Sequence, residues 1–171
     1  MHRQTAHINA VSPLYTPEQR KRRDTTRWTL VQGVLAPFQF VVFLVSIALI
    51  ARYLMTGEGL LAADLSIIAK TLVLYTIMIT GAVWEKVVFG QYLFARAFFW
   101  EDVFSMLVLA LHTAYLIATL GGFLDANGLM WLALAAYATY IINAGQFVWK
   151  LRVARLQSAR AQPALGGEVL S

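Results

Sequence analysis

Three carboxylates stand at the ends of strongly apolar segments of this sequence. Glu85 ends one such segment, and Glu101 and Asp102 begin the next. A carboxylate in or beside a bilayer is costly unless a cation, a ligand or water compensates it, so such a group is by default a candidate functional residue. Carboxyl groups removed from water can hold or accept a proton near neutral pH, which is the chemistry of a general acid and base. We therefore take Glu101, Glu85 and Asp102 as candidate catalytic residues.

Other polar side chains lie in or beside the same segments. His112 follows Glu101 by eleven residues, which returns it to nearly the same face of a helix about 16 Å deeper. Two glutamines lie two helical turns apart on one face of the first apolar segment, and two amides belong to a stripe at three-to-four spacing in the fourth. The candidate substrate-binding residues are His112, Lys86, Arg96, Gln32, Gln39, Asn143, Gln146, Trp84 and Trp100.

Each of these residues also has a simpler structural explanation. The acids can cap helix ends, because the helix dipole favours negative charge at an N-terminus. A single histidine can be a packing residue, and Gln and Asn often join transmembrane helices for about 1 kcal/mol or less each. At the level of sequence both explanations stay open.

The composition indicates how these residues are held. The chain is 59% hydrophobic and 13% charged, with a mean hydropathy of +0.62, which is too apolar for a soluble domain of this size. Four apolar runs each approach the ~20 residues that a helix needs to cross a bilayer. They cover roughly residues 29–51, 65–83, 103–124 and 129–149. We predict an all-α integral membrane protein with a four-transmembrane-helix bundle, in which Lys70 reaches toward the near interface.

The basic residues predict the orientation. Clusters of Arg and Lys flank the first run on its N-terminal side and the fourth on its C-terminal side, and such clusters stay in the cytoplasm. We expect both termini to be cytoplasmic. The net charge of +5 is then explained by topology and anionic lipids, so no nucleic-acid partner is expected.

The chain divides into one domain with two tails. We expect a disordered N-terminal tail over residues 1–13, a four-helix transmembrane catalytic domain over 14–156, and a disordered C-terminal tail over 157–171. Thr16 and Pro17 are typical of the start of a short helix that leads into the membrane. The chain has no cysteine, which excludes thiolate chemistry and cysteine-ligated metal centres; we expect no protein-bound metal.

The connection between the acids, residues 87–99, is rich in aromatic residues and too apolar for an ordinary solvated loop. We expect it to lie in the membrane interface, as part of an aromatic belt or as a lid over a pocket edged by carboxylates. A flat hydrophobic substrate with a charged group would suit this pocket. Arg96 or Lys86 would then meet an anionic group on it.

Five strings resemble the 3-vinyl bacteriochlorophyllide hydratase family of photosynthetic bacteria, and the resemblance covers about residues 14–156. They are WTLVQGVLAP (28–37), WEKVVFG (84–90), FFWEDV (98–103), LHTAY (111–115) and YIINAGQF (140–147). The resemblance implies a hydro-lyase without a cofactor. It would add water to the C3 vinyl group of a chlorophyllide-type macrocycle, giving a 1-hydroxyethyl group in bacteriochlorophyll biosynthesis, from a multi-pass position in the bacterial inner membrane.

The resemblance implies a role for each of several candidate residues. Glu101 is the expected general acid, with Glu85 or Asp102 as its partner. His112 ligates the magnesium of the substrate or hydrogen-bonds a ring carbonyl. Expected partners are the macrocyclic substrate and the lipid bilayer, and a second copy of the chain or other pigment-biosynthesis enzymes stay open. The alternative function is a non-catalytic membrane pigment-binding or assembly protein, which would not need Glu101.

Overall fold

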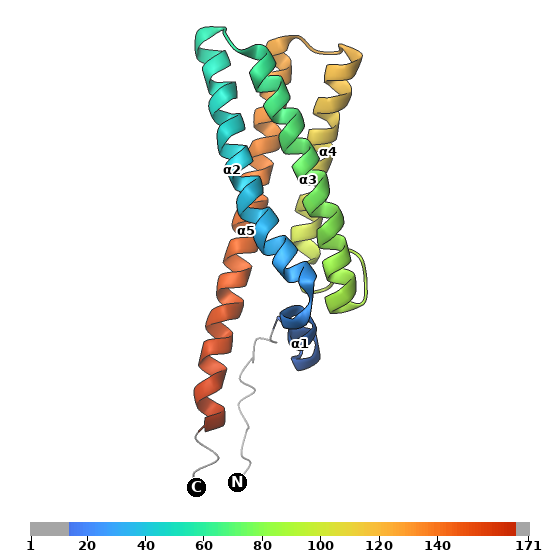
Figure 1. Ribbon diagram of the computed structural model, residues 1–171, viewed down its shortest axis with the longest axis vertical. Coiled ribbons are helices and arrows are strands. Elements are labelled where there is room, and N and C mark those ends of the chain that lie inside the picture. Colours follow the sequence, from blue (N-terminus) through green and yellow to red (C-terminus); the bar gives the residue numbers. More distant parts are fainter. Residues whose placement is uncertain (1–13, 167–171) are drawn as a thin grey trace, which may run out of the picture.

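The structure is a computed structural model that describes residues 14–166, with side chains described as far as Leu156. Within these residues the chain forms five helices and no strand (Figure 1). They are α1 (Pro17–Thr25), α2 (Arg27–Thr56), α3 (Leu60–Phe89), α4 (Phe99–Gly121) and α5 (Ala126–Gly166). The predicted all-α fold is confirmed. The predicted tail 1–13 lies outside the described residues, whereas α5 continues beyond Leu156 to Gly166, because Ala, Arg, Leu and Gln in that stretch are good helix formers.

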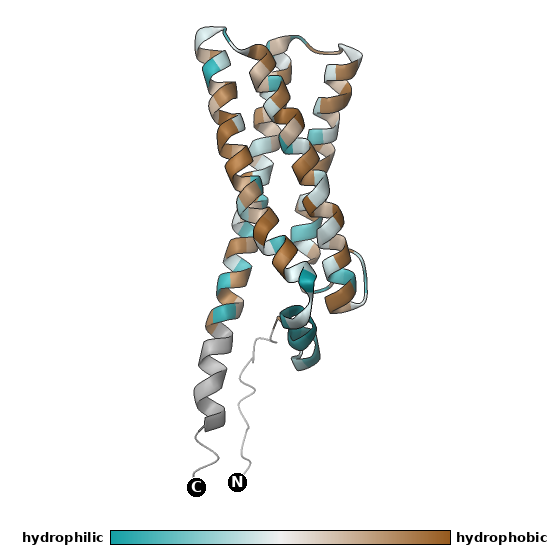
Figure 2. Cartoon of the chain, viewed as in Figure 1, coloured by the Kyte–Doolittle hydropathy of each residue, from teal (hydrophilic) through white to brown (hydrophobic). Residues whose placement is uncertain are grey.

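Four of the helices are long and apolar enough to cross a membrane. The candidate spans are Arg27–Thr56, Leu60–Phe89, Phe99–Gly121 and Ala126–Leu156. The first two have 30 residues each, or about 45 Å at 1.5 Å per residue, so they extend beyond a ~30 Å hydrocarbon core. In Figure 2 these helices carry broad hydrophobic bands, whereas the short α1 is hydrophilic. The four predicted spans are therefore present as helices that are long and apolar enough to cross a membrane.

The spans pack as two helix pairs. α2 packs along α3 and α4 packs along α5, whereas contacts between these pairs are fewer. The turn that joins α2 to α3 is short because Gly57 and Gly59 adopt left-handed conformations, with φ of 74° and 85°, which glycine adopts without a steric penalty. We call the interface between the α2–α3 pair and the α4–α5 pair the central seam.

The ends of the bundle differ. α1, the loop 90–98 and the C-terminal part of α5 lie at one end, and the other two interhelical turns lie at the opposite end (Figure 1). We call the first of these the α1 end. Because α1 and the last turns of α5 share it, the chain crosses the bundle an even number of times. That this end faces the cytoplasm stays a prediction.

The bundle is apolar outside and partly polar inside. Large apolar side chains are exposed along all four spans, as expected for surfaces in contact with lipid. The buried polar residues are Gln39, Ser46, Lys70, Thr71, Glu85, Glu101, Asp102, Ser105, His112 and Asn143. Hydrogen bonds cross the central seam, one between Ser46 and Tyr137 at 2.6 Å and one donated by Tyr115 to Asp64 at 2.8 Å. Buried polar side chains are thus concentrated between the two helix pairs.

Candidate active site

Glu85 and Asp102 form a carboxyl pair across the central seam at the α1 end. Glu85 lies in the last turns of α3 and is 5% exposed, and Asp102 lies in the first turn of α4 and is 4% exposed. Their side chains lie close enough to hydrogen-bond to one another. Two carboxyl groups in such contact are most stable when they share one proton, because two negative charges would repel and the hydrogen bond requires a hydrogen. This pair can both give and take a proton.

The loop between α3 and α4 binds both carboxyl groups through its backbone. The Phe94 N–H donates to Asp102 Oδ2 at 2.7 Å, and the Ala95 N–H donates to Glu85 Oε2 at 3.2 Å. Phe94 has a φ of 58°, in the left-handed region that non-glycine residues seldom adopt. This conformation aims two successive N–H groups at the pair. Such donors stabilise negative charge on the carboxyls.

Glu101 has a different partner from its neighbour Asp102. Lys150 Nζ, from α5, lies 2.6 Å from Glu101 Oε2. The same ammonium lies 5.1 Å from the centre of the Phe98 ring. The negative charge of Glu101 is therefore paired directly with a positive one, whereas Glu85 and Asp102 accept hydrogen bonds from the backbone of the loop.

Aromatic rings pack around Phe98 beneath the acids. Phe98 is 2% exposed and contacts the rings of Trp84, Phe89 and Phe147 at centroid distances of 5.7 to 5.8 Å. Tyr15 closes this group from the segment before α1. The predicted interfacial loop thus begins only at Gly90, since residues 87–89 belong to α3, and it turns Ala95 and Phe98 inward while Tyr92 and Phe94 stay exposed.

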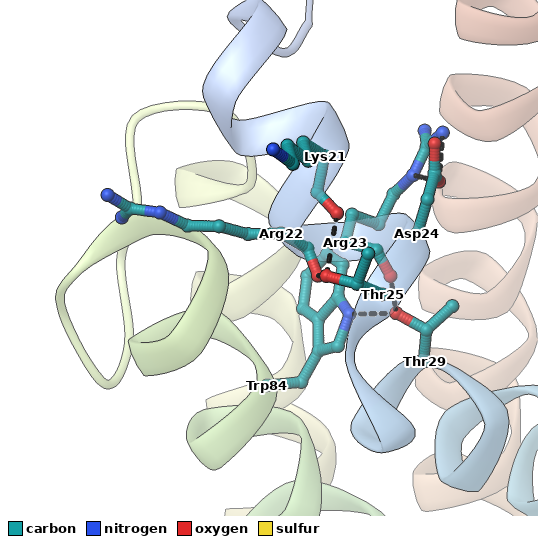
Figure 3. Close-up of polar contacts among 7 residues, drawn as sticks. All are labelled: Lys21, Arg22, Arg23, Asp24, Thr25, Thr29 and Trp84. Atoms are coloured by element: carbon teal, nitrogen blue, oxygen red, sulfur yellow. Dashed lines mark hydrogen bonds and ion pairs between the residues drawn. The ribbon is translucent and has the colours of Figure 1, made fainter.

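α1 is tied to this region by a short hydrogen-bond chain, drawn in Figure 3. Trp84 Nε1 donates to Thr29 Oγ1 at 2.9 Å, and Thr29 Oγ1 donates to the Arg23 carbonyl at 2.6 Å. Trp84 is therefore half-buried and oriented by α1 and α2. It forms part of the wall beside Glu85 rather than an exposed belt residue.

Three predicted substrate-binding residues are exposed, unlike the buried acids. Lys86 is exposed and donates to the Gly90 carbonyl at 2.8 Å. Arg96 is exposed, and Trp100 is 67% exposed. The cation that pairs with one of the three candidate acids is Lys150, which contacts Glu101. Lys150 continues the three-to-four stripe of Asn143 and Gln146, so the sequence indicates which face of the helix carries it. The sequence does not indicate that its partner is Glu101 on α4.

The predicted deeper residues do line the interior. On α4, Glu101, Ser105 and His112 are all buried on one face, as their spacing predicts. Asn143 Nδ2 donates to Ser105 Oγ at 2.8 Å, which links α5 to α4 one turn beyond the acids. Gln39 is 3% exposed and its Oε1 has no partner among the described residues. Gln32 instead joins α2 to α3 through a 2.7 Å hydrogen bond to Thr80.

His112 has one ring nitrogen free for a ligand. His112 Nδ1 lies 2.8 Å from the Val108 carbonyl, which can only accept, so Nδ1 carries the hydrogen and the neutral ring presents a lone pair at Nε2. Nε2 is buried and has no partner within the described residues. The ring stacks on Tyr137 at 5.7 Å. An Nδ1–H bound to a carbonyl is the usual support of a histidine that ligates a metal through Nε2.

The prediction for Lys70 was wrong. It was expected to reach the membrane interface, but it is 0% exposed and its Nζ lies 3.8 Å from the centre of the Tyr140 ring on α5. The position lies on the buried face of α3, at helical spacing from Ile67 and Leu74. α3 begins at Leu60, well before the predicted run, so Lys70 is well inside the helix and its ammonium points into the bundle.

The comparisons with known proteins agree on one family. The model of the 2-vinyl bacteriochlorophyllide hydratase family matches residues 15–153. The chain belongs to this family. Among its relatives, the 2-vinyl bacteriochlorophyllide hydratase of Cereibacter sphaeroides is 69% identical over 150 residues, covering 87% of this chain and 92% of the relative. That of Rhodobacter capsulatus is also 69% identical, over 146 residues and 85% of both chains. No solved structure matches.

Family membership makes this hydratase an enzyme of the hydro-lyase class. The family predicted from the sequence is confirmed. The family's name numbers the vinyl-bearing carbon 2, whereas the same carbon is numbered 3 in the resemblance given above. The matched region 15–153 contains the carboxyl pair, Glu101, Lys150 and His112. The buried polar groups described above thus lie within the part of the chain that defines the hydratase.

Proposed function

We propose that this hydratase adds water to the vinyl group of a bacteriochlorophyllide-type macrocycle and forms a 1-hydroxyethyl group. The names of the relatives supply the reaction. The observation that carries the assignment to a site is the buried Glu85–Asp102 pair at one end of a membrane bundle. Its carboxyl groups meet the two needs of alkene hydration, a proton for one carbon and an acceptor for the proton that the water loses.

The pair can complete the reaction without another reagent. The protonated carboxyl gives its hydrogen to the terminal vinyl carbon, and the π electrons of the vinyl group form the new C–H bond. The positive charge on the inner carbon is shared with the conjugated ring. Water then bonds to that carbon through oxygen, and its extra proton returns to the pair. The pair is restored, and the product has gained one water.

The backbone donors of the loop act after the carboxyl pair has given its proton to the substrate. After the proton leaves, the pair carries more negative charge, next to the cation that has formed on the substrate. The N–H groups of Phe94 and Ala95 already point at these oxygens, so they stabilise that charge without rearranging. This arrangement favours proton transfer from the pair.

The ion pair of Glu101 changes its expected role. Glu101 is the acid that the sequence favours, but its Oε2 lies 2.6 Å from the Lys150 ammonium and is engaged in an ion pair. We therefore assign proton transfer to Glu85 and Asp102, and to Glu101 the part of orienting Lys150 and adding negative potential beside the substrate cation. Asp102 and Glu101 remain adjacent in the first turn of α4.

His112 is the proposed contact to the centre of the macrocycle. Its free Nε2 would ligate the magnesium of the substrate, while Gln39 and Asn143 offer unpartnered amide oxygens in the interior. His112 follows Glu101 by eleven residues, or about 16 Å along α4. Only about half the width of the macrocycle separates its central magnesium from its vinyl group, so the His112 side chain has to reach toward the carboxyl pair for one substrate to make both contacts.

We place the enzyme in the bacterial inner membrane with its α1 end in the cytoplasm. The clustered Arg and Lys residues before α2 and after Trp149 support this orientation. The alternative of a non-catalytic pigment-binding protein is less favoured, because the chain belongs to a hydratase family. Any second copy or partner enzyme is left to experiment.

The proposal is tested in membranes from a host that lacks the pathway. Membranes with the wild-type chain are incubated with vinyl bacteriochlorophyllide, next to membranes without the chain. We expect a product heavier by one water, with absorption shifted to the blue because the vinyl group has left conjugation. Pigment binding without conversion would contradict the hydratase assignment and would favour a carrier.

A further inference from the structure

Lys70 is a buried cation without a counter-charge. Its side chain is 0% exposed, its Nζ has no hydrogen-bond partner, and no carboxylate forms an ion pair with it among the residues that the structure describes. The Nζ lies over the face of the Tyr140 ring, 3.8 Å from its centre. An aromatic face compensates only part of the cost of removing an ammonium from water. The site therefore lacks an anionic or accepting group.

The groups around Lys70 place it in the central seam. Tyr140 comes from α5, and His112 of α4 lies close enough for Lys70 to act on it electrostatically. Lys70 Nζ and His112 Nε2 are both buried and without partners. One is a donor and the other an acceptor, and neither is hydrogen-bonded to the other or to another described residue. A polar ligand between the helix pairs would give both of these atoms a partner.

We propose that Lys70 binds the free carboxylate of the macrocyclic substrate. This inference rests on the proposed function, because a bacteriochlorophyllide carries a free carboxylic acid that is esterified in the corresponding chlorophylls. An ammonium and a carboxylate make the strong, charge-assisted hydrogen bonds that such a site needs. Lys70 is then a specificity-determining residue, which selects the acid over its esters before the acid is esterified.

The spacing along α5 agrees with one substrate that reaches both centres. Tyr140 lies beneath Lys70 Nζ, and Lys150 contacts Glu101 beside the carboxyl pair. These two α5 residues are ten positions apart, or about 15 Å along the axis. A chlorophyllide macrocycle and its acid side chain extend over a comparable distance. The vinyl group can thus lie at the carboxyl pair while the carboxylate lies at Lys70.

The test compares the free acid of vinyl bacteriochlorophyllide with its methyl ester. Binding of each pigment is measured by quenching of the intrinsic tryptophan fluorescence, and KM and kcat are measured in the same membranes. The variants are Lys70→Met, which removes the charge, and Lys70→Arg, which keeps it. Lys21→Met is the matched control, because Lys21 is exposed on α1.

We expect the wild type, Lys21→Met and Lys70→Arg to prefer the acid. Lys70→Met should bind the acid about ten- to a hundredfold more weakly, the range for loss of a charged hydrogen bond, and should bind the ester nearly unchanged, with the effect in KM rather than kcat. A wild type that does not distinguish acid from ester would overturn the inference without any variant, as would a Lys70→Met variant that keeps the wild-type preference. If the protein binds the acid more tightly than the ester but does not hydrate it, the proposed function alone is contradicted.

Discussion

Three acids of the same chemical kind have different partners at the α1 end. Glu85 and Asp102 face each other and two backbone N–H groups, whereas Glu101 contacts an ammonium. Residue type alone therefore does not distinguish the three acids, whereas their contacts across the helices do.

The Glu101–Lys150 contact should stabilise the fold. The two side chains are only 10% and 25% exposed, so removing either partner leaves a poorly solvated charge. We expect Glu101→Gln or Lys150→Met alone to lower the free energy of unfolding by about 1–3 kcal/mol. The double variant should lose less than the sum of the two. Thermal denaturation in detergent measures this cycle, and strictly additive losses would show that the contact contributes nothing.

His112 should matter for pigment binding more than for folding. In His112→Leu the free Nε2 is lost while the side chain stays large and apolar, so we expect the protein to insert into membranes at the wild-type level. Less pigment should co-purify with it, because the proposed magnesium ligand is absent. Equal pigment retention by the variant and the wild type would assign His112 to packing.

The loop 90–98 is the element that brings the acid pair and its donors together. It connects α3 to α4 across the central seam, so the last turns of one helix pair and the first turn of the other meet beneath it. The left-handed conformation of Phe94 aims the donors. A residue of this kind is expected to cost about 1 kcal/mol or more unless its surroundings require it.

Two substitutions at Phe94 separate backbone geometry from side-chain contacts. Glycine adopts φ near 58° freely, whereas a β-branched residue does not. We expect Phe94→Gly to keep most of the hydration rate and Phe94→Val to lose rate and thermal stability, because the two N–H groups turn away from the carboxyls. Similar hydration rates in the two variants would show that the left-handed conformation of Phe94 does not affect catalysis.

Across the whole molecule, the sequence predicted the spans well and their contacts poorly. Four apolar runs were sufficient for four helices, because each span requires a long run without charge. Lys70 was misplaced because a lone charge near the start of a run resembles a boundary, and only the spacing with Ile67 and Leu74 placed it on the buried face. The Glu101–Lys150 contact joins residues 49 positions apart, which no local pattern specifies.

The predicted topology is tested by reporters at the two chain ends. Both ends of the described chain lie at the α1 end (Figure 1), and the flanking basic residues predict that this end is cytoplasmic. We expect a reporter that fluoresces only in the cytoplasm to be active at both termini and inactive when inserted in the turn between Gly122 and Asp125. Fluorescence from the reporter in that turn would show the opposite orientation, with the α1 end outside the cytoplasm.

The central claim is that the Glu85–Asp102 pair, and not Glu101, supplies the proton to the vinyl group. The most direct measurement is the single-turnover hydration rate of Glu85→Gln and Asp102→Asn next to Glu101→Gln, in membranes that bind equal amounts of pigment. We expect the first two rates to fall by about a hundred- to ten-thousandfold, the range for loss of general acid–base catalysis, and the third to fall much less. The account is contradicted if Glu101→Gln abolishes hydration while Glu85→Gln and Asp102→Asn still turn over.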